Sequence, residues 1–197
     1  MPLLETRASA SAQGYGLFGA TASTGNFFLI SKQVLGSSAT TVTFSSIPST
    51  YKSLQIRGLS RDTGGGAAQD VGYYLQFNSD TASNYSFHKL QATGAGVVSA
   101  TGFASQTLVG VSGSSSNATA ANVMGVSIVD IVDYANNNKN KTVKAFGGMN
   151  DNGTTAAIYM SLASGLWMST AAITSITIGA GTTAFATGTT FSLYGVS

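Results

Sequence analysis

The sequence contains no cysteine, a single histidine and only two prolines. Disulfide bonds and thiolate metal sites are therefore excluded. No apolar run approaches the roughly 20 residues that a membrane-spanning helix needs. The first residues also lack the order of a signal peptide, because Glu5 and Arg7 follow the short apolar start instead of preceding it. These absences predict a protein that is made in the cytoplasm and not inserted into a membrane.

Charge is also scarce in this chain. Lys, Arg, Asp and Glu make up 8% of the 197 residues, whereas about 25% is usual. The nine basic residues are spread out, and the densest basic segment is only "NKNKTVK" at 138–144. A nucleic-acid partner is excluded on this ground, because phosphate binding requires clustered Lys and Arg. Repulsion between charged surfaces keeps protein molecules apart, and this surface is nearly uncharged. We therefore expect the chain to function within an assembly.

Residues 1–25 differ in composition from the rest. They are rich in Ala, Ser, Thr and Gly, so they cannot bury enough apolar surface to fold alone. Tyr15, Leu17 and Phe18 stand among glycines in this segment. Large apolar side chains on a pliable backbone suit docking, and we predict an extended N-terminal arm that anchors the chain through these three residues. A plain tail is the alternative.

Residues 26–197 have the pattern of one domain built from short strands and Gly-, Ser- and Asn-rich turns. Within 51–59, Leu54 and Ile56 alternate with polar residues, as in a half-buried strand. The longest apolar run, at 122–134, is rich in β-branched residues and predicts a central strand. "NDNG" at 150–153 is typical of a hairpin turn. About nine or ten strands, with at most one helical turn at 167–173, predict an all-β, jelly-roll-like antiparallel β-sandwich.

The stretch "FNSDTASNYSFHKL" at 77–90 holds the only histidine, His88. Any Ser–His–Asp triad would have to use it, but serines are so common that one near His88 carries no information. We interpret the stretch as a strand, an Asx-type turn at Asn78–Asp80 and a second strand that begins near Tyr85. No catalytic residue is predicted, and we expect the protein not to be an enzyme.

Oxygen-rich segments at 78–80 and 150–152 contain Asn and Asp, which are ligands that calcium uses. A calcium site usually takes about six to eight oxygens and several carboxylates, so turn capping is the better interpretation. A glycosidase pair of carboxylates is not evident either, because Asp130 and Asp133 lie three residues apart in a predicted strand and point to opposite faces. We predict no metal site and no cofactor.

Aromatic side chains in this chain stand beside many amides and hydroxyls. Aromatic faces with such partners can hold sugars without charge, although rings in alternating patterns usually belong to a core. A glycan site is therefore an open alternative. The candidate residues for contact with a glycan or a host surface are Tyr85, His88 and Trp167.

Five segments follow one another in a recognisable order. They are "FSSIPSTYKSLQIRGLSR" (44–61), "YLQFNSDTASNYSFHKLQATG" (74–94), "IVDIVDYANNNKNKTVKAFGG" (128–148), "GLWMSTAAITSITIGAG" (165–181) and "TGTTFSLYGVS" (187–197). Together they resemble a group of tailed-bacteriophage virion proteins that is frequent in phages of aquatic bacteria. The resemblance covers roughly residues 26–197. It extends less clearly over the N-terminal arm.

The resemblance implies a structural protein of the virion surface, with no family catalytic residues to carry over. We predict a homo-oligomer, with a trimer favoured, that is associated with the tail fibre or tail tip and takes part in host attachment. Its expected partners are further copies of itself, other virion proteins bound through the arm, and a host-surface glycan. Two alternatives stay open: a capsid decoration protein of the cement or head-fibre kind, and a carbohydrate-binding β-sandwich module.

Overall fold

A computed structural model describes residues 26–64, 71–94, 96–115, 121–150, 158–181 and 183–197. These residues form twelve β-strands and contain no helix. The strands are β1 (Phe27–Val34), β2 (Thr41–Phe44), β3 (Ser53–Arg61), β4 (Val71–Phe77), β5 (Tyr85–Thr93), β6 (Val98–Gln106), β7 (Val109–Ser115), β8 (Gly125–Val132), β9 (Lys141–Met149), β10 (Tyr159–Trp167), β11 (Ile176–Ala180) and β12 (Thr190–Val196). The predicted all-β class is confirmed.

A search of the described residues for a helix long and apolar enough to cross a membrane finds none.

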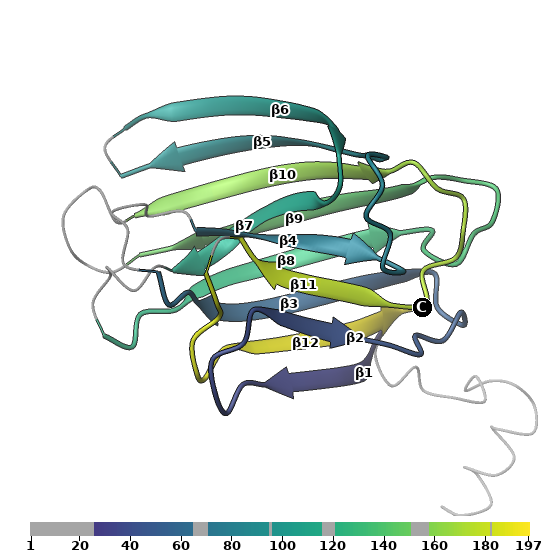
Figure 1. The fold of residues 1–197 in the computed structure, drawn as a ribbon, viewed down its shortest axis with the longest axis horizontal. Helices are drawn as coiled ribbons and strands as arrows, with labels where there is room; N and C mark the ends of the chain where they lie inside the picture. The colour runs from purple at the N-terminus through teal and green to yellow at the C-terminus, as the bar shows by residue number, and fades with distance from the viewer. Residues whose placement is uncertain (1–25, 65–70, 95, 116–120, 151–157, 182) are drawn as a thin grey trace, which may run out of the picture.

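The strands form two sheets packed as a sandwich (Figure 1). The large sheet has the order β1-β12-β3-β8-β9-β10-β5-β6, and all its neighbours are antiparallel. The small sheet has the order β2-β11-β4-β7 and lies in front of the large sheet in Figure 1. A short parallel pairing of β3 with β7, at Ser60↔Ser114 and Arg61↔Ser115, joins the two sheets along one side.

Eight of the strands alternate between the sheets in a regular way. In chain order, β1, β3, β8 and β12 belong to the large sheet, whereas β2, β4, β7 and β11 form the small one. The β5–β6 and β9–β10 hairpins lie wholly in the large sheet and widen it. These hairpins give the large sheet more strands than the small sheet can cover.

Side chains that point between the two sheets form the core. β3 buries Leu54 and Ile56, as the alternation in the sequence predicts. β8 lies between β3 and β9, so the prediction of a central strand is also correct. Aromatic rings fill two parts of the core. One cluster contains Tyr73, Phe185 and Phe191, and the other contains Phe77, Tyr85 and Trp167.

Other predictions about single segments have mixed outcomes. β9 and β10 pair antiparallel as the expected hairpin, although residues 151–157, which include most of the "NDNG" turn, lie outside the described part. Residues 167–173 contain no helical turn. Instead, the chain between β10 and β11 is held by bonds such as Ile173 N–H to Tyr134 O, at 2.8 Å.

The predicted arm, residues 1–25, lies outside the described residues, and so do its proposed anchoring side chains Tyr15, Leu17 and Phe18.

Candidate functional site

The stretch that carries the only histidine folds as predicted, as strand, turn and strand. Asp80 N–H donates to Phe77 O at 2.9 Å, and the Asp80 carboxylate accepts from Ala82 N–H at 2.9 Å. Asn78 and Ser79 have φ values of 53° and 56°, a conformation that Asn tolerates well. The Asn78 side chain also accepts from Thr174 N–H and Ser175 N–H, so it fastens the turn to the chain before β11. These oxygens cap backbone groups, as the turn interpretation requires.

Asp80 is the hub of this turn. Its Oδ2 accepts from Trp167 Nε1–H at 2.7 Å and from Asn84 Nδ2–H at 2.8 Å. The hydrogen bond from Asn84 is the largest cause of a lowered pKa of the Asp80 carboxyl, and burial opposes it. Asp80 therefore joins β4, β5 and the end of β10 as a charged acceptor.

Two of the three candidate glycan contacts lie in the core instead of on the surface. Tyr85 is 0% exposed and Trp167 is 2% exposed, and their rings stack on each other with centroids 6.1 Å apart. The Tyr85 hydroxyl accepts from Phe77 N–H and donates to Asp80 O. Neither ring has a face that reaches the solvent. The prediction that these residues touch a glycan is therefore wrong, and both rings pack in the core.

His88, the third candidate, is exposed on the large sheet. Its neighbours across the strands are Ser164 on β10 and Gly102 on β6. Its ring lies over Gly102, where a Cβ would be only 2.5 Å from His88 Cδ2. Neither neighbour is the carboxylate that a triad base needs.

The most distinctive surface of the described structure is an apolar face on the large sheet, on the side turned away from the small sheet. Two adjacent rows of side chains cross the strands there. The first row runs Ile128–Phe146–Leu162–Leu90, and the second contains Leu59, Val126, Met160 and Val98. These eight side chains, which we call the apolar face, are each 41% to 67% exposed. A half-covered sheet normally places polar residues on its solvent side.

The apolar face has relief. Phe146 stands between two shallow hollows, because its neighbours Ile128 and Leu162 each line one of them. The hollow beside Leu162 also includes His88 and has a volume of about 360 Å³. The hollow beside Ile128 also includes Arg57 and has a volume of about 320 Å³.

Polar groups border the apolar face along one side. The next row across the strands contains Gln55, Asp130 and Lys144. Gln55 Nε2–H donates to Asp130 Oδ1 at 2.8 Å, and Arg57 Nε–H donates to Gln55 Oε1 at 2.8 Å. The Arg57 guanidinium also lies over the rings of Phe27 and Tyr194. One acidic and one basic side chain thus stand opposite each other beside the apolar surface.

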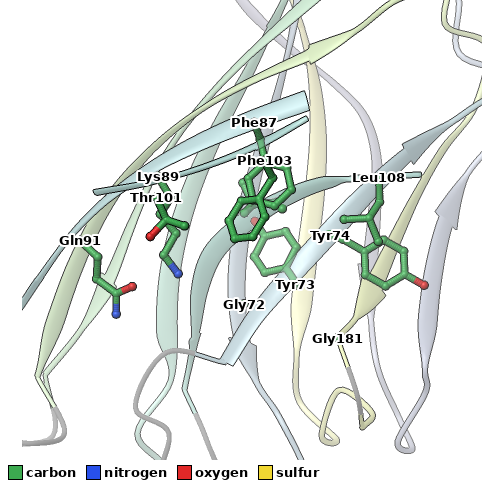
Figure 2. A pocket seen from close by; sticks show the side chains of 12 residues that line it. Gly72, Tyr73, Tyr74, Phe87, Lys89, Gln91, Thr101, Phe103, Leu108 and Gly181 are labelled. Atoms are coloured by element: carbon green, nitrogen blue, oxygen red, sulfur yellow. The ribbon is translucent and has the colours of Figure 1, made fainter. Parts of the chain in front are cut away.

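A second candidate surface is a groove between the β5–β6 hairpin and the outer side of the small sheet. It has a volume of about 440 Å³. Figure 2 shows Lys89, Gln91 and Thr101 on one side, Tyr74 and Leu108 on the other, and Phe87 and Phe103 between them. We call this site the aromatic groove. Its lining is mostly apolar with a few polar groups, as in pockets that bind small ligands.

Glycines shape the aromatic groove. At Gly110 on β7, a Cβ would lie 2.7 Å from Phe87 Cε2, so only glycine lets the Phe87 ring rest on the strand. The Phe87 ring stacks on Phe103 with centroids 4.6 Å apart. The Tyr74 ring likewise lies over Gly179 of the neighbouring strand. Gly110 and Gly179 therefore leave the space that the rings of Phe87 and Tyr74 occupy.

The buried charge of Lys141, outside both candidate surfaces, has structural partners. Lys141 is 0% exposed, and its ammonium donates to the carbonyls of Asn136, Lys139 and Thr170 at 2.6, 2.7 and 3.1 Å. Burial lowers its pKa, and the nearby charge of Asp133 opposes this effect. In the described part of the chain, no group of three or more His, Asp or Glu could hold a metal ion.

The sequence contained a signal for the apolar face that its interpretation left unused. Residues 122–134 are apolar on both alternating sets of positions, which is typical of a strand covered on both sides. The structure covers only the side with Val129 and Ile131 and exposes Val126 and Ile128. The aromatic groove had no comparable signal, because its residues come from four strands and two sheets.

Compared with known proteins, the chain matches no family model and no curated protein. The resemblance to phage virion proteins therefore stays a prediction.

Proposed function

We propose that the protein is a non-enzymatic structural component of a tailed-phage virion that assembles with copies of itself through the apolar face. The assignment to a virion is based on the sequence resemblance. The proposal of self-assembly is based on the apolar face. The alternation of strands between the two sheets resembles the winding of a jelly roll, an architecture that is common in viral capsid proteins. Because one fold can serve many functions, the fold gives this proposal less support than the sequence resemblance and the apolar face do.

The size of the apolar face supports a protein partner. Its eight side chains are each 41% to 67% exposed, and their two rows span six neighbouring strands of the large sheet. A large contiguous apolar patch on the surface of a soluble protein marks an interaction site. Free in water, such a surface would favour aggregation.

A second copy of this chain fits the face in shape and charge. Phe146 is 50% exposed and lies between the two hollows, so the Phe146 of each copy can enter a hollow of the other. Asp130 and Lys144 are paired across the strands, and a reversed second copy brings opposite charges together. A surface of this kind is self-complementary, which is what a two-fold interface requires. The trimer predicted from the sequence would instead bring different parts of the face together.

Light scattering on the purified chain tests the assembly. We expect a mass of two or three times the 20.0 kDa of one chain. Phe146→Lys should yield monomers, because a buried interface cannot hold an unpaired charge. Met168→Lys is the matched control, since Met168 is similarly exposed but lies outside the apolar face. A monomeric parent protein, or an oligomer that persists in Phe146→Lys, would contradict the proposal.

The place in the particle needs its own test. We favour the tail fibre or tail tip, with a role in host attachment, and the capsid decoration protein is the alternative. Peptide mass spectrometry of purified particles from the phage that encodes the chain should detect it, and antibody labelling in electron microscopy should mark the tail. Label on the head would favour the decoration protein, and absence from the particles would overturn the virion assignment.

A further inference from the structure

We propose that the aromatic groove is a saccharide-binding site. A short saccharide would pack the C–H face of one sugar ring on Phe103, with Tyr74 to one side, and would bond further hydroxyls to Thr101 and Gln91 on the other side. This inference deepens the proposed role in host attachment, and it rests on that role only for the source of the sugar. Its chemistry depends on the groove alone.

The shape of the groove favours a flat ligand. Gly72, Gly110 and Gly181 line it, so no side chain rises from these positions. The volume of about 440 Å³ lies within the range of about 300–1,000 Å³ for small-molecule sites. A cavity of this size accommodates a short saccharide, and it is too small for a folded partner.

The aromatic rings provide the apolar surface. Phe103 is 41% exposed although it stacks on Phe87 with an interplanar angle of 27°. Gly110 fixes the position of the Phe87 ring, which in turn supports Phe103. The Phe103 ring is therefore held in place before a ligand arrives, and this lowers the entropy cost of binding. A pyranose ring has C–H groups on one face, which pack on such a ring.

Neutral polar groups stand beside the rings. Gln91 and Thr101 point to the groove from neighbouring strands (Figure 2), and Lys89 pairs with Thr101 across them. An amide and a hydroxyl each donate and accept hydrogen bonds, as sugar hydroxyls do. A purely apolar ligand would leave these groups without partners as it buried them, and that is unfavourable. The combination of ring faces and neutral donors and acceptors thus fits a saccharide better than a lipid.

The first experiment is a glycan array with the labelled full chain, followed by calorimetry with the best saccharide found. Gln91→Ala and Phe103→Ala should each weaken binding by about tenfold, which corresponds to the loss of one good contact. His88→Ala is the matched control on the same hairpin, because His88 lies on the opposite side of β5 and should leave the affinity unchanged. Circular dichroism verifies that each variant is folded.

An array without hits would overturn the proposal. So would a saccharide whose affinity falls in His88→Ala but not in Gln91→Ala, because this result would move the site to the apolar face. Light scattering on the same proteins keeps the two proposals apart. Binding by a monomeric chain would support the groove and contradict self-assembly, whereas a non-binding oligomer would do the reverse.

Discussion

The indole Nε1–H of Trp167, at the end of β10, donates to the Asp80 carboxylate at 2.7 Å. This bond links the buried ring cluster of Phe77, Tyr85 and Trp167 to a turn between the two sheets. The same carboxylate also accepts from Asn84 and from Ala82 N–H. One side chain therefore connects the core with the crossing of the chain between the sheets.

Replacement of this hub should destabilise the fold. Asp80→Ala removes three hydrogen bonds to a charged acceptor, and we expect a loss of about 2–3 kcal/mol in the free energy of unfolding. Urea denaturation measures it as a lower midpoint with an unchanged slope. Lys139→Ala is the control, because its ion pair with Asp133 is exposed and should contribute less than about 1 kcal/mol. Equal effects of the two variants would show that the bond to Trp167 has no special weight.

Acid should weaken the protein through the same carboxylate. The folded pKa of Asp80 is below the ordinary 3.8. Between these two values the unfolded chain binds more protons than the folded one, so stability falls as the pH drops through this window. As the pH is lowered from neutral into the acid range, the melting temperature should therefore fall less steeply in Asp80→Asn than in the parent. An identical decline would mean that other carboxylates cause the acid sensitivity.

Alkali should act through two tyrosines. Burial raises the pKa of Tyr73 and of Tyr85 to about 12, above the ordinary 10.0. Their stabilising contribution is complete below pH 10.0 and is lost as the pH rises toward about 12, because only the unfolded chain releases the protons in that range. Burial also raises the pKa of Tyr134. Ultraviolet titration should therefore show a group of late-ionising tyrosines that loses two members in the double variant Tyr73→Phe/Tyr85→Phe. Ionisation of every tyrosine near pH 10 in the folded protein would refute this.

Lys141 should contribute to stability, although its charge is not paired with a buried acidic side chain. Its ammonium donates to three carbonyls, and Lys141→Met would leave these acceptors without the donor. Because a hydrogen bond to a charged group contributes about 1.5–3 kcal/mol, we expect a loss of at least about 2 kcal/mol in chemical denaturation. Lys139→Met, at an exposed position two residues earlier, should change stability little. A neutral Lys141→Met would indicate that water replaces the ammonium.

The sequence predicted those parts of the fold that depend on local alternation. Leu54 and Ile56 and the central strand at 122–134 are examples, because a period of two directly determines which side chains face the core. β6 was not predicted, since "VSATGFASQ" is almost entirely exposed and has no buried face. Tyr85 and Trp167 were misplaced for a different reason. Their neighbouring amides resemble a sugar site, and only the packing of two sheets decides that the rings are inside.

The candidate sites were less predictable than the strands. Phe87 and Gly110 meet only because the β5–β6 hairpin lies over the outer side of β7, and no local pattern encodes that contact. The apolar face depends on the register of six strands, which aligns Phe146 with Leu162 and Leu90. Both sites follow from how the strands are placed in space, which one sequence does not determine.

The position of β12 also has a consequence for biosynthesis. This strand is the last of the twelve in the chain, and yet it lies between β1 and β3 and pairs with both. Until residues 190–196 have left the ribosome, β1 has no neighbour in the large sheet and β3 has one unpaired side. The sheet therefore closes late, and the nascent chain exposes unpaired strands throughout translation, when chaperone binding would protect it best.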